Sequence, residues 1–66
     1  MPRLDLLRKW MSNSGLKKGY IIREMGISRA AFSLKMRGDR PFTLYEIKVF
    51  RRLGMTLSEI DQIFLR

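Results

Sequence analysis

The stretch that decides the fold is GLKKGYIIREMGISRAAFSLKMRG, residues 15–38. It holds two runs with helical apolar spacing, and Gly26 stands between them. Glycine often ends a helix because it adopts the left-handed conformation at little cost. Ser28 is a preferred N-cap residue, whose side chain can accept a hydrogen bond from the first turn of the helix that follows. The stretch therefore predicts two short helices, over residues 17–25 and 29–36, joined by a tight turn.

This pair has the form of a helix-turn-helix, in which the second helix enters the major groove of DNA. In the second run, Phe32 and Met36 are spaced i, i+4 and are expected to face the core. In the first run, we expect Met25 to face the core together with either Tyr20 or Ile21.

Gly19 lies in the first turns of the first predicted helix, where glycine costs up to about 1 kcal/mol relative to alanine. Two explanations fit this position. One is ordinary tolerance of glycine near a fraying helix end. The other is a close approach of the backbone to a phosphate or to another helix.

A further helix is predicted before this stretch. Leu4, Leu7 and Met11 form one apolar face over residues 3–13, and Gly15 is expected to end the helix.

Two more helices are predicted after it, each starting at a capping box, in which a Thr is followed three residues later by a Glu. Thr43 and Glu46 start the first of them, which Gly54 ends. Thr56 and Glu59 start the second, which runs to the end of the chain.

A length of 66 residues limits the chain to one domain, residues 1–66. Its hydrophobic content of 45% is typical of a folded protein and well above that of a disordered tail. No segment alternates apolar and polar residues between hairpin turns. The expected fold class is therefore all-α, a compact bundle of five short helices.

The sequence contains no Cys and no His. Their absence removes the thiolate ligands of zinc, the commonest general base and the best nucleophile. We therefore expect no enzyme activity and no metal. The Met and aromatic residues are explained as core, so we also expect no cofactor and no small-molecule ligand. No apolar run approaches the roughly 20 residues that span a bilayer, and the start MPRLD lacks the apolar stretch of a signal peptide, so a cytoplasmic protein is expected.

Fourteen Lys and Arg stand against six Asp and Glu, which gives a formal net charge of +8. Such an excess indicates a polyanionic partner or an anionic membrane surface. Nine of the fourteen are Arg, the side chain best suited to bidentate contacts with phosphate and guanine, so the composition favours nucleic acid.

The order Gly15-Leu, a short helix ending Met-Gly-Ile-Ser, then Arg-Ala-Ala-Phe-Ser and Gly38 resembles the helix-turn-helix of the phage Cro and lambda-type repressor family. The likeness covers about residues 15–60 and is strongest to short Cro-like proteins of phages that infect Gram-positive bacteria. Two positions depart from the family. Ile22 replaces an Ala where the motif helices touch, and Lys17-Lys18 replaces the Thr-Gln that usually starts the first motif helix.

The resemblance implies a transcriptional repressor of a bacterial host cell that binds a palindromic double-stranded DNA operator as a homodimer. The whole motif spans residues 17–37. The resemblance places the base contacts on its second helix. Chemistry supports three of these positions, since Arg29 can bind guanine O6 and N7 bidentately, Ala30 can pack on a thymine methyl group, and a Ser hydroxyl can donate or accept. The base-contacting set is Ser28, Arg29, Ala30, Ser33 and Leu34.

Residues on both sides of this helix are candidates for phosphate contacts, which supply affinity without sequence preference. Between residues 16 and 40, seven Lys or Arg stand against Glu24 and Asp39. The phosphate-contacting set is Lys17, Lys18, Tyr20, Lys35, Arg37 and Arg40.

One face of a terminal helix cannot bury three consecutive apolar residues, which here are Ile63, Phe64 and Leu65. Either they form a dimer interface with a second copy or they fold back on the first helix, and we expect the dimer. Two other functions stay open: a protein-interaction module acting as antirepressor or antitoxin, and a basic peptide that lies on a membrane surface, which the glycine stops and capping boxes disfavour.

Overall fold

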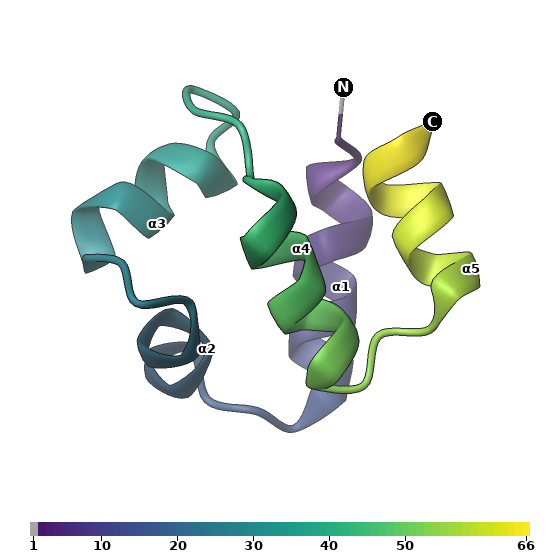
Figure 1. The fold of residues 1–66 in the computed structure, drawn as a ribbon, viewed down its shortest axis with the longest axis horizontal. Helices are drawn as coiled ribbons and strands as arrows, with labels where there is room; N and C mark the ends of the chain where they lie inside the picture. The colour runs from purple at the N-terminus through teal and green to yellow at the C-terminus, as the bar shows by residue number, and fades with distance from the viewer. Residues whose placement is uncertain (1) are drawn as a thin grey trace.

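In a computed structural model, residues 2–66 form helices joined by short turns, with no strand among them (Figure 1). The all-α class and the five predicted helices are confirmed, with boundaries within about one residue of those expected. The helices are α1 (Leu4–Ser14), α2 (Lys18–Met25), α3 (Arg29–Met36), α4 (Leu44–Arg52) and α5 (Leu57–Ile60), and the π-helical turn η1 (Asp61–Leu65) continues α5.

The predicted caps set these boundaries. Thr43 and Thr56 each accept a hydrogen bond from the N–H group three residues on, and the carboxylates of Glu46 and Glu59 each accept one from the backbone N–H of the capping Thr. Gly26 ends α2 with φ of +71°, a conformation that costs a residue with a side chain far more than it costs glycine. Local sequence therefore accounts for where the helices begin and end.

The core lies where α1, α4 and η1 meet the α2–α3 pair. Phe32 and Phe50 are fully buried, and the ring of Phe42 packs edge-on against both. Trp10 of α1 meets Phe50 edge-on at 5.7 Å between ring centroids. The other buried apolar residues are Leu7, Ile21, Ile22, Met25, Val49, Met55 and Ile63.

The two ends of the chain pack together, as Figure 1 shows for α1 and α5. The N–H of Arg3 donates to the carbonyl oxygen of Ile63 at 2.7 Å, and the ring of Phe64 stacks on Phe50 at 5.8 Å. Ile63 is 3% exposed and Phe64 is half-buried, whereas Leu65 is exposed. The expectation that Ile63 lies at a dimer interface is therefore wrong, because the chain's own α1 covers it.

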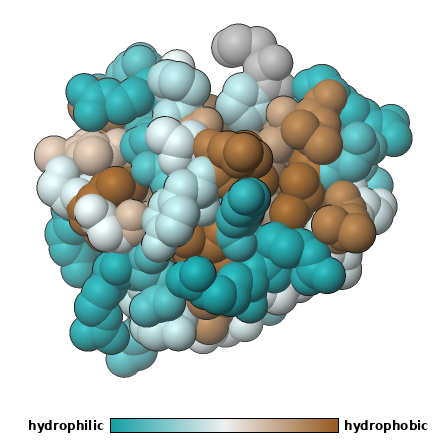
Figure 2. Space-filling model, in the orientation of Figure 1, coloured by the Kyte–Doolittle hydropathy of each residue, from teal (hydrophilic) through white to brown (hydrophobic). Residues whose placement is uncertain are grey.

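The π-helical turn has a consequence for the C-terminal surface. An α-helix has about 3.6 residues per turn, and the i→i+5 hydrogen bonds of a π-helix add about one residue to each turn. One α-helical turn followed by one π-helical turn therefore spans about eight residues. Leu57 and Leu65 are eight residues apart and are both exposed. They consequently lie on one side of α5 and η1, and Figure 2 shows hydrophobic residues over this part of the molecule.

None of the helices in residues 2–66 combines the length and the apolarity that crossing a bilayer requires.

Candidate nucleic-acid interface

Helices α2 and α3 form a compact pair with only residues 26–28 between them. The N–H of Gly26 donates to the carbonyls of Ile22 and Arg23, which closes the end of α2. The hydroxyl oxygen of Ser28 accepts from the N–H of Ala31 at 3.1 Å, which starts α3. In Figure 1, α2 is seen end-on while α3 crosses in the plane of the picture. The turn therefore carries the chain from one helix directly into another of different direction.

Helix α3 has a buried and an exposed side. Phe32 faces the core, whereas four residues at positions i, i+1, i+4 and i+8 are exposed. These spacings bring side chains to one side of a helix. We call this surface the α3 face; it consists of Arg29, Ala30, Ser33 and Arg37.

The structure places the remaining candidate base contacts at the margin of the α3 face. Leu34 is half-buried, so only part of its side chain is exposed. Ser28 is exposed, but its oxygen already caps α3. Its hydroxyl hydrogen stays free to donate, since the hydroxyl only accepts in the cap.

At the N-terminal end of α3, the side chain of Arg29 lies over the start of α2. A β-carbon built on Gly19 would lie 3.1 Å from Arg29 Nη2. Lys17 and Lys18 flank this glycine and are both exposed. Within residues 2–66, none of these three cationic side chains has a hydrogen-bond or ion-pair partner. Three cations therefore gather where α2 and α3 begin.

At the other end of α3, the turn over residues 37–43 carries two exposed arginines. Arg37 forms an ion pair with Asp39 at 2.9 Å, in which both side chains are more than half exposed. Exposed pairs of this kind contribute little to stability, roughly 0–1 kcal/mol, so Arg37 can exchange its partner easily. Arg40 is exposed, and no side chain in the described part of the protein pairs with it.

Lys35 is the candidate that the structure contradicts. Its side chain is only 6% exposed, and Nζ lies 2.7 Å from Glu46 Oε1 and donates to the carbonyl of Pro41 at 3.2 Å. The ammonium group therefore faces the interior of the protein, so the prediction that Lys35 contacts phosphate is wrong. The i, i+3 relation to Phe32 is the signal that places Lys35 on the buried side of α3.

Tyr20 is 39% exposed, and the guanidinium carbon of Arg23 lies 5.9 Å from the centroid of its ring. Its hydroxyl makes no hydrogen bond within residues 2–66. Of the two alternatives for the core side of α2, the structure selects Ile21, which is fully buried.

Arg8 is a residue that sequence reasoning missed. It comes from α1, and its Nη2 donates to the carbonyl of Met36 at 2.7 Å, at the last residue of α3. A cation is favourable at this position because the free carbonyls of a helix end carry partial negative charge. The two residues are 28 positions apart, so no local pattern reveals the contact.

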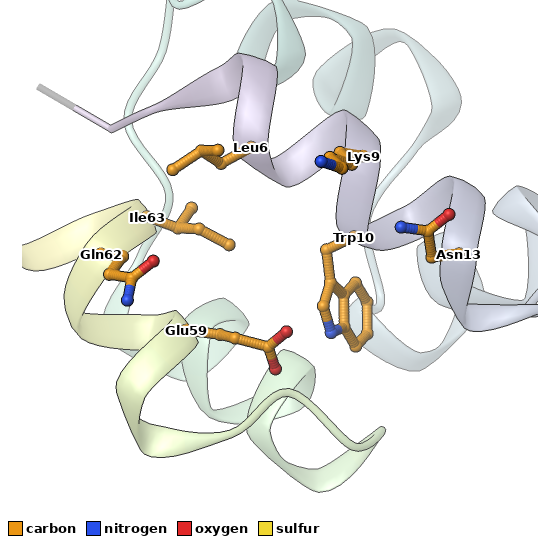
Figure 3. Close-up of a pocket in the computed structure, with 7 residues that line it drawn as sticks. All are labelled: Leu6, Lys9, Trp10, Asn13, Glu59, Gln62 and Ile63. Atoms are coloured by element: carbon orange, nitrogen blue, oxygen red, sulfur yellow. The ribbon is translucent and has the colours of Figure 1, made fainter.

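A shallow groove of about 190 Å³ lies elsewhere, between α1 and the α5–η1 segment, and is lined by Leu6, Lys9, Trp10, Asn13, Glu59, Gln62 and Ile63 (Figure 3). This groove is separate from the α3 face, and residues 2–66 contain no cluster of three acidic side chains able to hold a metal ion. The exposed side of α3 offers hydrogen-bond donors and positive charge, and the buried Lys35–Glu46 pair lies on the opposite, core-facing side. Compared with known proteins, the chain gives no significant match to a family model, a curated protein or a solved structure.

Proposed function

We propose that this protein is a sequence-specific double-stranded DNA-binding regulator that inserts α3 into the major groove. The observation that carries the proposal is the exposed α3 face with cations at both ends, from Lys17 and Lys18 at one end to Arg40 at the other, none of them paired with an acid of the described chain. A major groove about 12 Å wide admits one α-helix and leaves a phosphate backbone on each side of it. Side chains on the helix then meet base edges while the flanking cations meet phosphates.

The division of roles follows from side-chain chemistry. On the α3 face, Arg29 can form two hydrogen bonds with guanine, and Ala30 can pack against a thymine methyl group. Ser33 can donate a hydrogen bond to a base or accept one from it. Phosphate contacts fall to Lys17, Lys18, Arg37 and Arg40, and Tyr20 can add a hydroxyl donor. Replacing any one of the phosphate-binding cations should reduce the slope of log affinity against log salt by about 0.9.

The size of the protein supports a homodimer on DNA. Its longest extent is 27 Å, whereas successive major grooves on one side of a duplex are about 34 Å apart. One chain therefore cannot read two half-sites. Two chains related by a twofold axis would read an inverted repeat.

The C-terminal surface suits this pairing. Residues 53–66 contain two acids, Glu59 and Asp61, and one base, Arg66, which pairs with Asp61 at 2.8 Å, whereas the whole chain carries +8. Two copies of so basic a chain repel each other least where they meet through this segment. It also holds the exposed leucines Leu57 and Leu65, which are 69% and 68% exposed. We assign the dimer contact to these two residues together with Phe64, in place of the buried Ile63.

Repression of the Cro type is the regulatory role we propose, because a protein that occupies the major groove of an operator blocks access of other proteins to that DNA. The test is selection from a pool of random duplexes, sequenced after binding at two salt concentrations. Enrichment of an inverted repeat with half-sites one helical turn apart is the expected result. Salt-sensitive binding with no enriched motif contradicts sequence specificity, and no binding at either salt concentration favours a protein-interaction module.

A further inference from the structure

The close approach of Arg29 to Gly19 has a direct bearing on recognition. Gly19 lies inside the first turn of α2 with an ordinary helical backbone, so nothing in its conformation requires glycine. Glycine weakens a helix at such a position relative to alanine. The space above it is occupied by the end of the Arg29 side chain, with Nη2 3.1 Å from the point a β-carbon would take.

A β-carbon contact of 3.1 Å is tighter than ordinary van der Waals contact, so alanine at position 19 would push the guanidinium by a few tenths of an ångström. A longer side chain would take its place altogether. Arg29 is exposed and its guanidinium has no ion-pair partner among the described residues, so the contact over Gly19 is the interaction from which its position is argued. Of the two explanations that the sequence left open for Gly19, the structure supports the close approach, which is made by the side chain of Arg29 from α3.

We infer that Gly19 is a specificity-determining position that acts through Arg29. By leaving room over α2, it lets the guanidinium rest at the start of α3 in one defined place, from which it reaches the groove. A guanidinium held before binding loses less conformational freedom on binding a base than one that moves freely. The inference rests on the proposed DNA-binding function and adds a residue that does not itself contact DNA.

The experiment is a double-mutant cycle on the ratio of affinities for the selected operator and for random duplex. Gly19→Gln introduces a good helix former that fills the space, and it should lower the ratio roughly tenfold, the size of one bidentate base contact. The melting temperature should stay unchanged or rise, because Gln is a better helix former than Gly. If the affinity ratio fell because the protein unfolds, the melting temperature would fall as well. Lys48→Gln, an exposed substitution on α4, is the control and should leave the ratio unchanged.

The same Gly19→Gln change in an Arg29→Ala background decides the mechanism. If Gly19 acts through Arg29, the ratio should change by less than about twofold there, within the error of additivity. An equal loss in both backgrounds would mean that the new side chain meets DNA directly and would overturn the inference.

A second readout needs no DNA. Nuclear Overhauser effects between the Arg29 guanidinium protons and the Gly19 α-protons are expected in the free wild-type protein, and Gly19→Gln should displace the guanidinium from this position. Their absence from the wild type would refute the positioning of Arg29 even if DNA binding is specific. If these effects are present but the protein binds no DNA, the close approach of Arg29 to Gly19 is confirmed. The role of that approach in recognition and the proposed function are then both refuted.

Discussion

Lys35 and Glu46 form a buried ion pair, with 2.7 Å between Nζ and Oε1, that ties α3 to the first turn of α4. The same Oε1 accepts a hydrogen bond from the backbone N–H of Thr43 at 2.9 Å, which makes the capping glutamate part of the pair. The ammonium also donates to Pro41. One carboxylate therefore fixes both the start of α4 and the position of α3 against it.

Removing one partner of this pair should be costly. Lys35→Ala leaves Glu46 buried without its counter-charge, and we expect a loss of about 3–5 kcal/mol in the free energy of unfolding. Lys35→Met combined with Glu46→Gln keeps the capping box and removes both charges, so it should recover most of the loss. Urea denaturation followed by circular dichroism measures both. A cost of less than about 0.5 kcal/mol for Lys35→Ala, typical of a surface site, would show that the pair is solvated.

The cap of α3 offers a second test. Ser28→Ala removes the oxygen that accepts from Ala31, and the free energy of unfolding should fall by about 1 kcal/mol. Ser33→Ala lies on the α3 face, makes no hydrogen bond through its side chain within residues 2–66, and should change stability by no more than about 0.5 kcal/mol. Equal losses for the two variants would contradict the assignment of Ser28 as the cap.

The C-terminal residues separate folding from association. Ile63→Ala creates a cavity under α1 and should lower the free energy of unfolding by about 2–5 kcal/mol. Leu65→Ser changes an exposed residue and should leave the stability of the monomer within about 0.5 kcal/mol of wild type. Analytical ultracentrifugation on operator DNA should show two wild-type chains per duplex and weaker pairing for Leu65→Ser. Unchanged pairing would exclude the Leu57 and Leu65 side of the protein as the dimer contact.

Base and phosphate contacts differ in how they respond to sequence and salt. Arg29→Ala should lower discrimination between operator and random duplex by about 1–3 kcal/mol. Arg40→Ala should weaken binding to both duplexes equally and lower the salt slope by about 1. Fluorescence anisotropy at several salt concentrations measures both quantities. If Arg29→Ala left discrimination intact, α3 would not be the helix that reads bases.

The sequence predicts the helices well because the signals that end and start them are local. Gly26 and the capping residues act on neighbours within four positions, so their spacing shows where each helix lies. The amphipathic pattern likewise identifies part of the core, including Leu7, Met25 and Phe32. The helix-turn-helix spacing follows from the same local rules.

The errors concern residues whose surroundings are set by distant parts of the chain. Lys35 looks like a surface cation until α4 places Glu46 against it, and the two are 11 residues apart. Ile63 looks unpartnered in the sequence because the helix that packs against it, α1, lies at the other end of the chain. The role of Arg8 at the end of α3 depends on tertiary packing in the same way.

The central claim is that the α3 face meets the major groove, and amide chemical-shift mapping on a selected duplex tests it most directly. The account predicts that the largest shifts fall on Arg29, Ala30 and Ser33, with smaller ones at Lys18 and Arg40, where phosphates would lie. Shifts confined to α5 and η1, or absent throughout at a saturating duplex concentration, would contradict it.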